Sequence, residues 1–173
     1  METSHTWWER TKRNPEAFHA WLRDQYRGEQ TAAGRILALR EQFAQQGTRA
    51  WRVLGVIAQQ EQEHARWVHG LLEARGLQPQ EKAERYWPHV LSQIGDLETG
   101  AAVGAHAERM RLERIEAIAS DPESPEDVRR VFQKILPQER FHERAFARLA
   151  GTEALARTAD AHELGRQALG LAP

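Results

Sequence analysis

Glu61-Gln62-Glu63-His64 and Glu139-Arg140-Phe141-His142 are the two stretches of sequence that decide the fold. Each contains a glutamate and a histidine three residues apart, so both side chains project from one face of a helix. The interval from Glu61 to Glu139 equals the interval from His64 to His142, and each stretch interrupts an otherwise apolar helical stripe. Burying a carboxylate costs several kcal/mol unless a partner compensates its charge. The pattern therefore indicates a polar site inside a helical core.

Two further glutamates extend this pattern over most of the chain. Glu29 precedes Glu61 by almost the same interval as Glu108 precedes Glu139. The chain thus repeats one pair of helices, aligned on these residues. A glutamate from each of two helices, with Glu-x-x-His from each of the other two, is the ligand arrangement of dinuclear carboxylate sites in helical bundles. The candidate metal ligands are Glu29, Glu61, His64, Glu108, Glu139 and His142.

Helix-breaking residues divide the chain into segments. Ala, Leu, Glu, Gln and Arg dominate the sequence, which is the composition that helices favour. Asn14-Pro15 opens a first long helix, which ends before Gly47. Thr48 caps a second helix that runs to Gly76. The first half of the chain is therefore predicted to form a helical hairpin.

The second half is predicted to repeat this hairpin after a longer connection. Residues 79–95 form the connection, with a short helix that Trp87-Pro88 interrupts, and Ser124-Pro125 caps the fourth long helix. The sequence predicts an all-α four-helix bundle with a crossover between the second and third helices and an additional C-terminal helix. We expect a single domain over residues 1–173 with its bundle core at about 15–150. The remaining helices are expected over residues 96–120, 124–151 and 152–169.

Composition excludes several classes of function. The sequence has no cysteine, so it cannot form a disulfide, a zinc–thiolate site or an iron–sulfur cluster bound by its own thiolates. Its formal net charge is −1, from 24 Lys+Arg against 25 Asp+Glu, which gives no basic surface for nucleic acid or an anionic membrane. Because no apolar run approaches ~20 residues and residues 1–10 lack a signal-peptide pattern, we expect a cytoplasmic protein.

The sequence resembles the ferritin-like superfamily, and rubrerythrin-like di-iron carboxylate proteins more than ferritins proper. The resemblance covers about residues 20–150 and rests on the glutamates and histidines above, including Gly28-Glu29-Gln30. It implies a ferritin-like bundle that holds two iron ions, with manganese as an alternative at one or both positions. In this family Glu61 and Glu139 would bridge the two metals, and His64 and His142 would bind one metal each.

The same resemblance gives Glu29 and Glu108 the role of terminal carboxylate ligands. The sequence departs from the family in two respects. It lacks the four cysteines of a rubredoxin-like iron site, and Arg111 stands three residues after Glu108, where many members carry a second glutamate. Both departures favour an oxidase or oxygenase over a peroxidase.

The leading hypothesis is a non-haem di-iron oxidoreductase that acts on dioxygen or peroxide. Its expected partners are an external electron donor, a small organic substrate and a second copy of the chain in a homodimer, with no nucleic acid and no membrane. Tyr26 lies three residues before Glu29 on the same helix face. It is therefore a candidate redox or hydrogen-bonding residue beside the metals.

Two alternative functions remain open from the sequence. An iron-handling protein, either a ferroxidase or a storage subunit, would use the same six ligands. A metal-free helical interaction module would instead balance the buried glutamates with arginines. The arginines considered for that role are Arg35, Arg66, Arg109 and Arg140.

Overall fold

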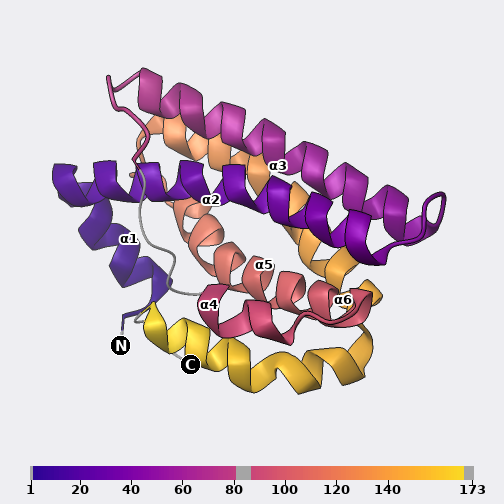
Figure 1. Cartoon of the computed structure of the whole chain (residues 1–173). Coiled ribbons are helices and arrows are strands. Elements are labelled where there is room, and N and C mark those ends of the chain that lie inside the picture. The colour runs from indigo at the N-terminus through magenta and orange to yellow at the C-terminus, as the bar shows by residue number, and fades with distance from the viewer. Residues whose placement is uncertain (1, 81–86, 170–173) are drawn as a thin grey trace.

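The computed structural model describes residues 2–80 and 87–169, and within these ranges every long element is a helix (Figure 1). None of the described helices is both long enough and apolar enough to cross a membrane. The four long helices are α2 (Pro15–Phe43), α3 (Arg49–Glu73), α5 (Leu97–Ser120) and α6 (Glu126–Ala168). The shorter elements are α1 (Ser4–Arg13), α4 (Trp87–Val90) and a 3-10 turn, Leu91–Gln93.

The long helices form two hairpins that pack into a bundle. Helix α2 packs along α3, and α5 packs along α6, while the connection between α3 and α5 carries α4. Thr48 caps α3 as the sequence predicts, because its side chain accepts a hydrogen bond from a backbone N–H in the first turn; Asn14 and Asp96 do the same for α2 and α5. The all-α bundle with a crossover between its second and third long helices is confirmed.

The additional C-terminal helix is also present, as the last part of α6. Gly151 has φ 70° and ψ 167°, which breaks the helical backbone at the position where the sequence predicts a boundary. Glycine tolerates this positive φ because it has no Cβ. Beyond Gly151 the chain turns back and runs along α5 and α4, as the yellow helix in Figure 1 shows.

The short helix predicted in the connection is present as α4, and the part of that prediction on residues 81–86 lies outside the described residues. One local prediction is wrong. Ser124 does not cap α6, whose first turn has no side-chain cap. The Ser124 hydroxyl instead donates to the carbonyl of Ile118 at 2.9 Å and accepts the indole N–H of Trp8 at 2.9 Å.

Helix α1 has no counterpart among the sequence predictions, and distant contacts hold it in place. The Trp8 indole also donates to Asp121 at 3.0 Å, and the Lys12 ammonium donates to the same carboxylate at 2.7 Å. Burial raises the pKa of Asp121, but the hydrogen bonds from Lys12 and from the Glu123 backbone outweigh it, so the pKa lies below its ordinary value. These bonds tie α1 to the turn between α5 and α6.

We expect Asp121→Asn to lower the free energy of unfolding at pH 7 by about 1–3 kcal/mol, because Lys12 loses a charged partner. A carboxylate whose pKa is lowered by folding stabilises the fold above its unfolded pKa of about 3.9 and loses that contribution as the pH falls through the folded pKa. The free energy of unfolding in urea should therefore differ between wild type and Asp121→Asn at pH 7, and this difference should be smaller at pH 3. The exposed Asp160→Asn serves as control, and an unchanged difference at pH 3 would contradict the assignment.

Two apolar clusters fill the bundle on either side of a polar layer. One cluster packs α1 against the bundle around Trp8, Trp21 and Phe132. The other lies toward the opposite end, around Ile57, Ala101 and Phe146. The buried glutamates and histidines lie between them, so the apolar stripes of the long helices are interrupted in the middle, as the sequence predicts.

Candidate metal centre

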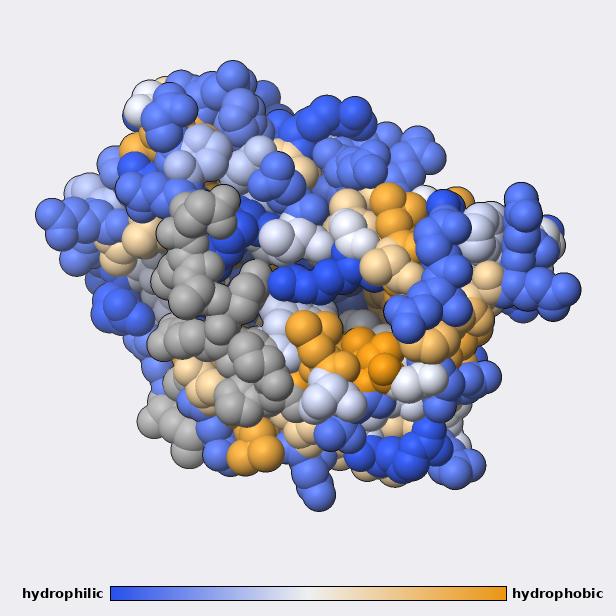
Figure 2. Space-filling view, in the orientation of Figure 1, coloured by the Kyte–Doolittle hydropathy of each residue, from blue (hydrophilic) through white to orange (hydrophobic). Residues whose placement is uncertain are grey.

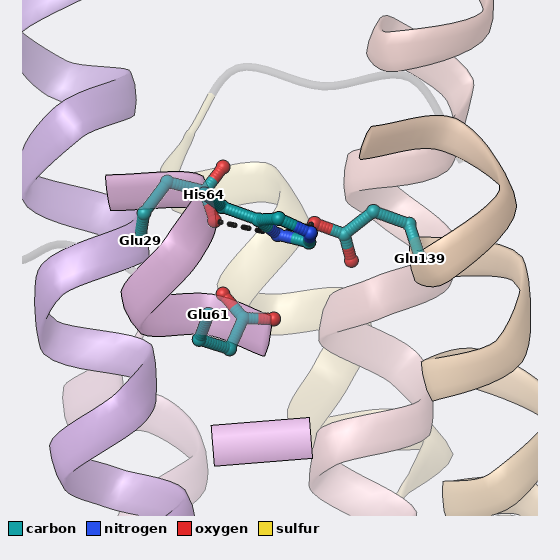
Figure 3. Close-up of side chains that lie close together, drawn as sticks. All are labelled: Glu29, Glu61, His64 and Glu139. Atoms are coloured by element: carbon teal, nitrogen blue, oxygen red, sulfur yellow. Dashed lines mark ion pairs between the residues drawn. The ribbon is translucent and has the colours of Figure 1, made fainter. Parts of the chain in front are cut away.

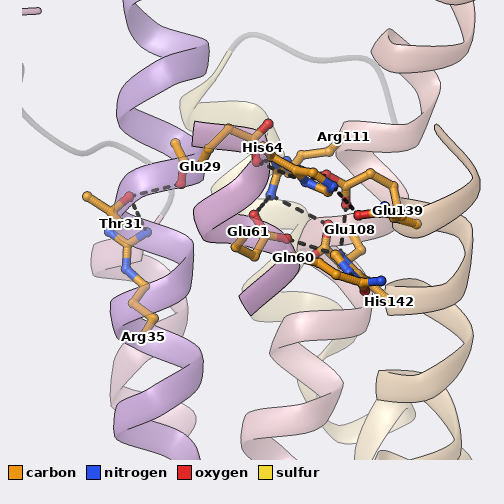
Figure 4. A network of polar contacts seen from close by, with 12 residues as sticks. Glu29, Thr31, Arg35, Gln60, Glu61, His64, Glu108, Arg111, Glu139 and His142 are labelled. Carbon is orange, nitrogen blue, oxygen red and sulfur yellow. Dashed lines mark hydrogen bonds and ion pairs between the residues drawn. The ribbon is translucent and has the colours of Figure 1, made fainter. Parts of the chain in front are cut away.

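Six acidic and imidazole side chains converge in the middle of the bundle (Figures 3 and 4). Five of them are 0% exposed, and Glu108 is 4% exposed. Helix α2 contributes Glu29, α5 contributes Glu108, and α3 and α6 each contribute a Glu-x-x-His pair. They form two overlapping groups in which the potential ligand atoms lie within 4.8 Å of one another. The groups are Glu29, Glu61, His64 and Glu139, and Glu61, Glu108, Glu139 and His142.

The potential ligand atoms of this cluster face one another, and most of them make no hydrogen bond. The Nδ1 atom of His64 lies 3.4 Å from a Glu139 oxygen, and that of His142 lies 3.0 Å from a Glu61 oxygen. Each of the six residues keeps at least one buried nitrogen or oxygen with no hydrogen-bond partner within the described part of the chain. Buried polar atoms are normally satisfied, so a whole set of unsatisfied atoms aimed at a common centre indicates a place for cations.

Two glutamines hold the histidines in the orientation that a metal requires. The Nε2 atom of His64 lies 2.8 Å from the Gln138 amide oxygen, and the Nε2 atom of His142 lies 2.9 Å from the Gln60 amide oxygen. An amide oxygen only accepts, so Nε2 carries the hydrogen and Nδ1 is directed at the carboxylates. Metal-binding histidines usually donate their second ring N–H in this way. Each glutamine directly precedes a glutamate of the cluster and lies on the opposite hairpin.

Arg111 extends its guanidinium into the same cluster from α5. Its nitrogens lie 2.5 Å from Glu29, 3.1 Å from Glu139, 3.4 Å from Glu61 and 3.6 Å from Glu108. Figure 4 shows it reaching between the carboxylates from above. This contact was not predicted from the sequence, although a position three residues after Glu108 faces the same way on a helix.

The arginines that were considered as counter-charges have other partners or positions. Arg66 pairs with Glu63 at 3.7 Å, and Arg140 pairs with Glu116 at 2.8 Å. Arg109 is exposed, and Arg35 stacks over the Trp87 ring at 4.1 Å. Among the arginines that the structure describes, Arg111, on the same helix as Glu108, is the one that contacts the buried glutamates.

A family model described as Rubrerythrin matches residues 21–150, three quarters of the chain and the greater part of the four-helix bundle. The chain belongs to the rubrerythrin family. This is a ferritin-like family of di-iron carboxylate proteins, as the sequence resemblance implies. No curated protein and no solved structure matched the chain. The family match and the buried cluster together make this rubrerythrin-family chain a candidate carboxylate-bridged metal protein.

The cluster carries more negative charge than Arg111 balances. Burial, together with the neighbouring Glu139, raises the pKa of Glu61 to about 7 and that of Glu108 well above its ordinary value. Burial also acts on Glu139, but Arg111 and the two histidines hold the pKa of this carboxyl well below its usual range. Without further cations, the cluster must therefore retain protons. Divalent ions would supply the missing positive charge, and a set of carboxylates with two imidazoles suits iron or manganese. The residues fit the metal centre that the family implies.

Tyr26 is not brought into this cluster. Its ring lies 5.2 Å from the His69 ring, and it lines a separate hollow between α2 and α3 with Gln30 and Arg66. Within the described residues it makes no hydrogen bond to any of the six candidate ligands. A redox or hydrogen-bonding role of Tyr26 beside the metals stays a prediction from the sequence.

Replacing Gln138 by leucine is expected to weaken metal binding by about 10- to 100-fold, the usual effect of losing a partner that orients a metal-binding histidine. Leucine has a similar size but cannot accept the Nε2 hydrogen of His64. Competition titration with a coloured Mn²⁺ or Fe²⁺ chelator measures the affinity. Gln62→Leu, on the exposed side of α3, is the control, and equal affinities in the two variants would show that Gln138 does not position His64.

Proposed function

We propose that this protein is a non-haem di-iron oxidoreductase that acts on dioxygen or peroxide. The observation that carries the proposal is the set of six buried side chains whose unsatisfied ligand atoms share one centre, with both histidines turned toward it by glutamines. We assign Glu29, Glu61, Glu108 and Glu139 as carboxylate ligands and His64 and His142 as imidazole ligands, and we expect about two ions per chain.

A pair of iron ions would supply one-electron redox chemistry at this centre. The residues of the chain would hold and shield it. Glu61 and Glu139 belong to both ligand groups, so they would be the ligands that two ions share. The apolar clusters cover the centre from the two ends of the bundle. Because the sequence has no cysteine, we expect electrons to come from a separate donor protein or from a substrate.

The proposal is tested by loading metal-free protein with Fe²⁺ under anaerobic conditions and then adding dioxygen or hydrogen peroxide. We expect about two Fe²⁺ per chain, oxidised faster by at least one oxidant than free Fe²⁺ in the same buffer. Glu61→Gln should lose this acceleration, because it removes a ligand shared by both groups. No acceleration with either oxidant, despite two bound ions, would contradict an oxidoreductase.

A metal-free interaction module is the second candidate, and Arg111 is the observation that favours it. Its guanidinium lies within 3.6 Å of all four glutamates and could balance part of their charge without a metal. The melting temperature distinguishes the two functions. A site that binds metal only in the folded state raises the melting temperature when metal is added, whereas an interaction module shows no dependence.

A further inference from the structure

A large cavity reaches the candidate metal centre from one side of the bundle. It has a volume of about 580 Å³ and lies between α1, α2 and α5, with Glu108 and Arg111 in its wall. Figure 2 shows a hollowed face on which hydrophobic side chains gather in the middle, with hydrophilic ones around them. Cavities of this size accommodate organic ligands, whereas peroxide or dioxygen needs only a fraction of the volume.

The cavity runs along α5, so the metal centre lies beside its middle. Arg114, Arg111, Glu108 and Gly104 all line it, and successive members are three or four residues apart on one helix face. The stripe from the first to the last corresponds to about 15 Å of helix. A molecule lying along this stripe would pass the candidate ligand Glu108.

The two ends of the cavity differ in chemistry. At the end nearer Gly104, it adjoins a second hollow of about 260 Å³, which shares Phe146 and Ile36 with it and is lined mainly by apolar side chains. At the other end lie Arg114 and Trp7, with the carboxylates of Glu2 and Asp24 also in the wall. The cavity therefore has an apolar end and a charged, aromatic end.

Two arginines line the cavity, and one of them keeps hydrogen-bond donors without an acceptor. The Nε and Nη1 atoms of Arg27 are buried with no hydrogen-bond partner within the described residues, and its Nη2 lies 3.6 Å from Asp24. The Arg114 guanidinium lies 4.5 Å from the centre of the Trp7 ring, and the carboxylates of Glu113, Glu2 and Asp24 attract its charge. Buried N–H donors without an acceptor are costly, so the two free donors of Arg27 favour a further anion in the cavity.

We propose that the cavity binds an organic carboxylate with an apolar body. Its carboxylate contacts Arg27 and Arg114, and its apolar body extends past Glu108 toward Gly104 and the adjoining apolar hollow. Guanidinium groups bind carboxylates through paired N–H donors, which matches the unsatisfied atoms of Arg27. Arg111 does not compete for this anion, because four glutamates already surround its charge. That the bound acid is a substrate rests on the proposed function; its binding does not.

The test uses metal-free full-length protein and 1-naphthylacetate, with the neutral 1-naphthylacetamide as a ligand of the same shape. Isothermal titration should show that the acid binds at least about tenfold more tightly than the amide, the effect of a charge-assisted hydrogen bond. Arg114→Gln and Arg27→Gln, made separately, should each remove most of this preference. Arg109→Gln, an exposed arginine of the same helix, should retain it.

Several outcomes would overturn the proposal. These are equal affinities for acid and amide in the wild type, no binding of either ligand, or a preference that survives in both cavity variants. Circular dichroism checks that each variant is folded. If one of the two cavity variants does not fold, the other still tests the proposal. Metal content, measured in parallel on loaded samples, should be the same in Arg114→Gln and wild type. A failure of ligand binding is therefore distinct from a failure of the metal centre.

Discussion

Replacing Glu139 by alanine is expected to abolish the binding of both metal ions. Glu139 belongs to both ligand groups, and its oxygens lie 3.4 Å from Nδ1 of His64 and 3.4 Å from Nδ1 of His142. Its pKa lies well below the ordinary value, with Arg111 as the main cause against the opposing effect of burial, so it is ionised and ready to bind a cation. No other glutamate of the cluster contacts both histidines within 4 Å.

The loss is measured by metal analysis and by the melting temperature with and without Mn²⁺ or Fe²⁺. At a free metal concentration a thousand times the dissociation constant, one site adds about 4 kcal/mol to stability. For a chain of this size, that raises the melting temperature by about 8–16 °C. The variant should show no such rise. Glu143→Ala lies four residues further along α6 and outside both groups, so it should behave as wild type. Retention of one metal in Glu139→Ala would mean that the two groups bind independently.

The helical bundle and its polar layer could be predicted because both follow from short-range sequence spacing. Glu61 and His64 share a helix face at three residues apart, and the same pair recurs in the second half of the chain as Glu139 and His142. The repeat shows which residues of the two hairpins correspond, so the four helices could be assigned from the sequence alone. Thr48 was predictable for the same reason, because a cap acts on a backbone N–H three residues away.

Features that depend on distant contacts could not be predicted in this way. Helix α1 is held by Trp8 and Lys12 against Asp121, which is far from both in the sequence. The glutamines that orient the two histidines could have been predicted from the sequence. Gln60 and Gln138 each stand directly before a glutamate of the repeated pair, so extending the repeat by one position would have found them.

Replacing Arg111 by methionine is expected to destabilise the metal-free protein and to strengthen its binding of metal. Removing one partner of a buried ion pair typically costs about 3–5 kcal/mol, and here four carboxylates lose their shared cation. Proton uptake by Glu61 and Glu108, whose pKa values burial already raises, limits that cost. Metal binding should strengthen because the guanidinium contacts the same carboxylates that the ions need.

Arg111→Met should lower the stability of the metal-free protein but strengthen its binding of metal. A general loss of folding would weaken both. The melting temperature of the metal-free variant should fall by about 6–20 °C, and saturating Mn²⁺ or Fe²⁺ should recover most of the difference. Arg111→Lys keeps the charge but concentrates it on one ammonium group. The melting temperature of this metal-free variant should therefore lie between those of wild type and Arg111→Met. Arg109→Met is the exposed control. If metal fails to recover the stability of Arg111→Met, the arginine is a structural replacement for the ions, and the metal-free function gains support.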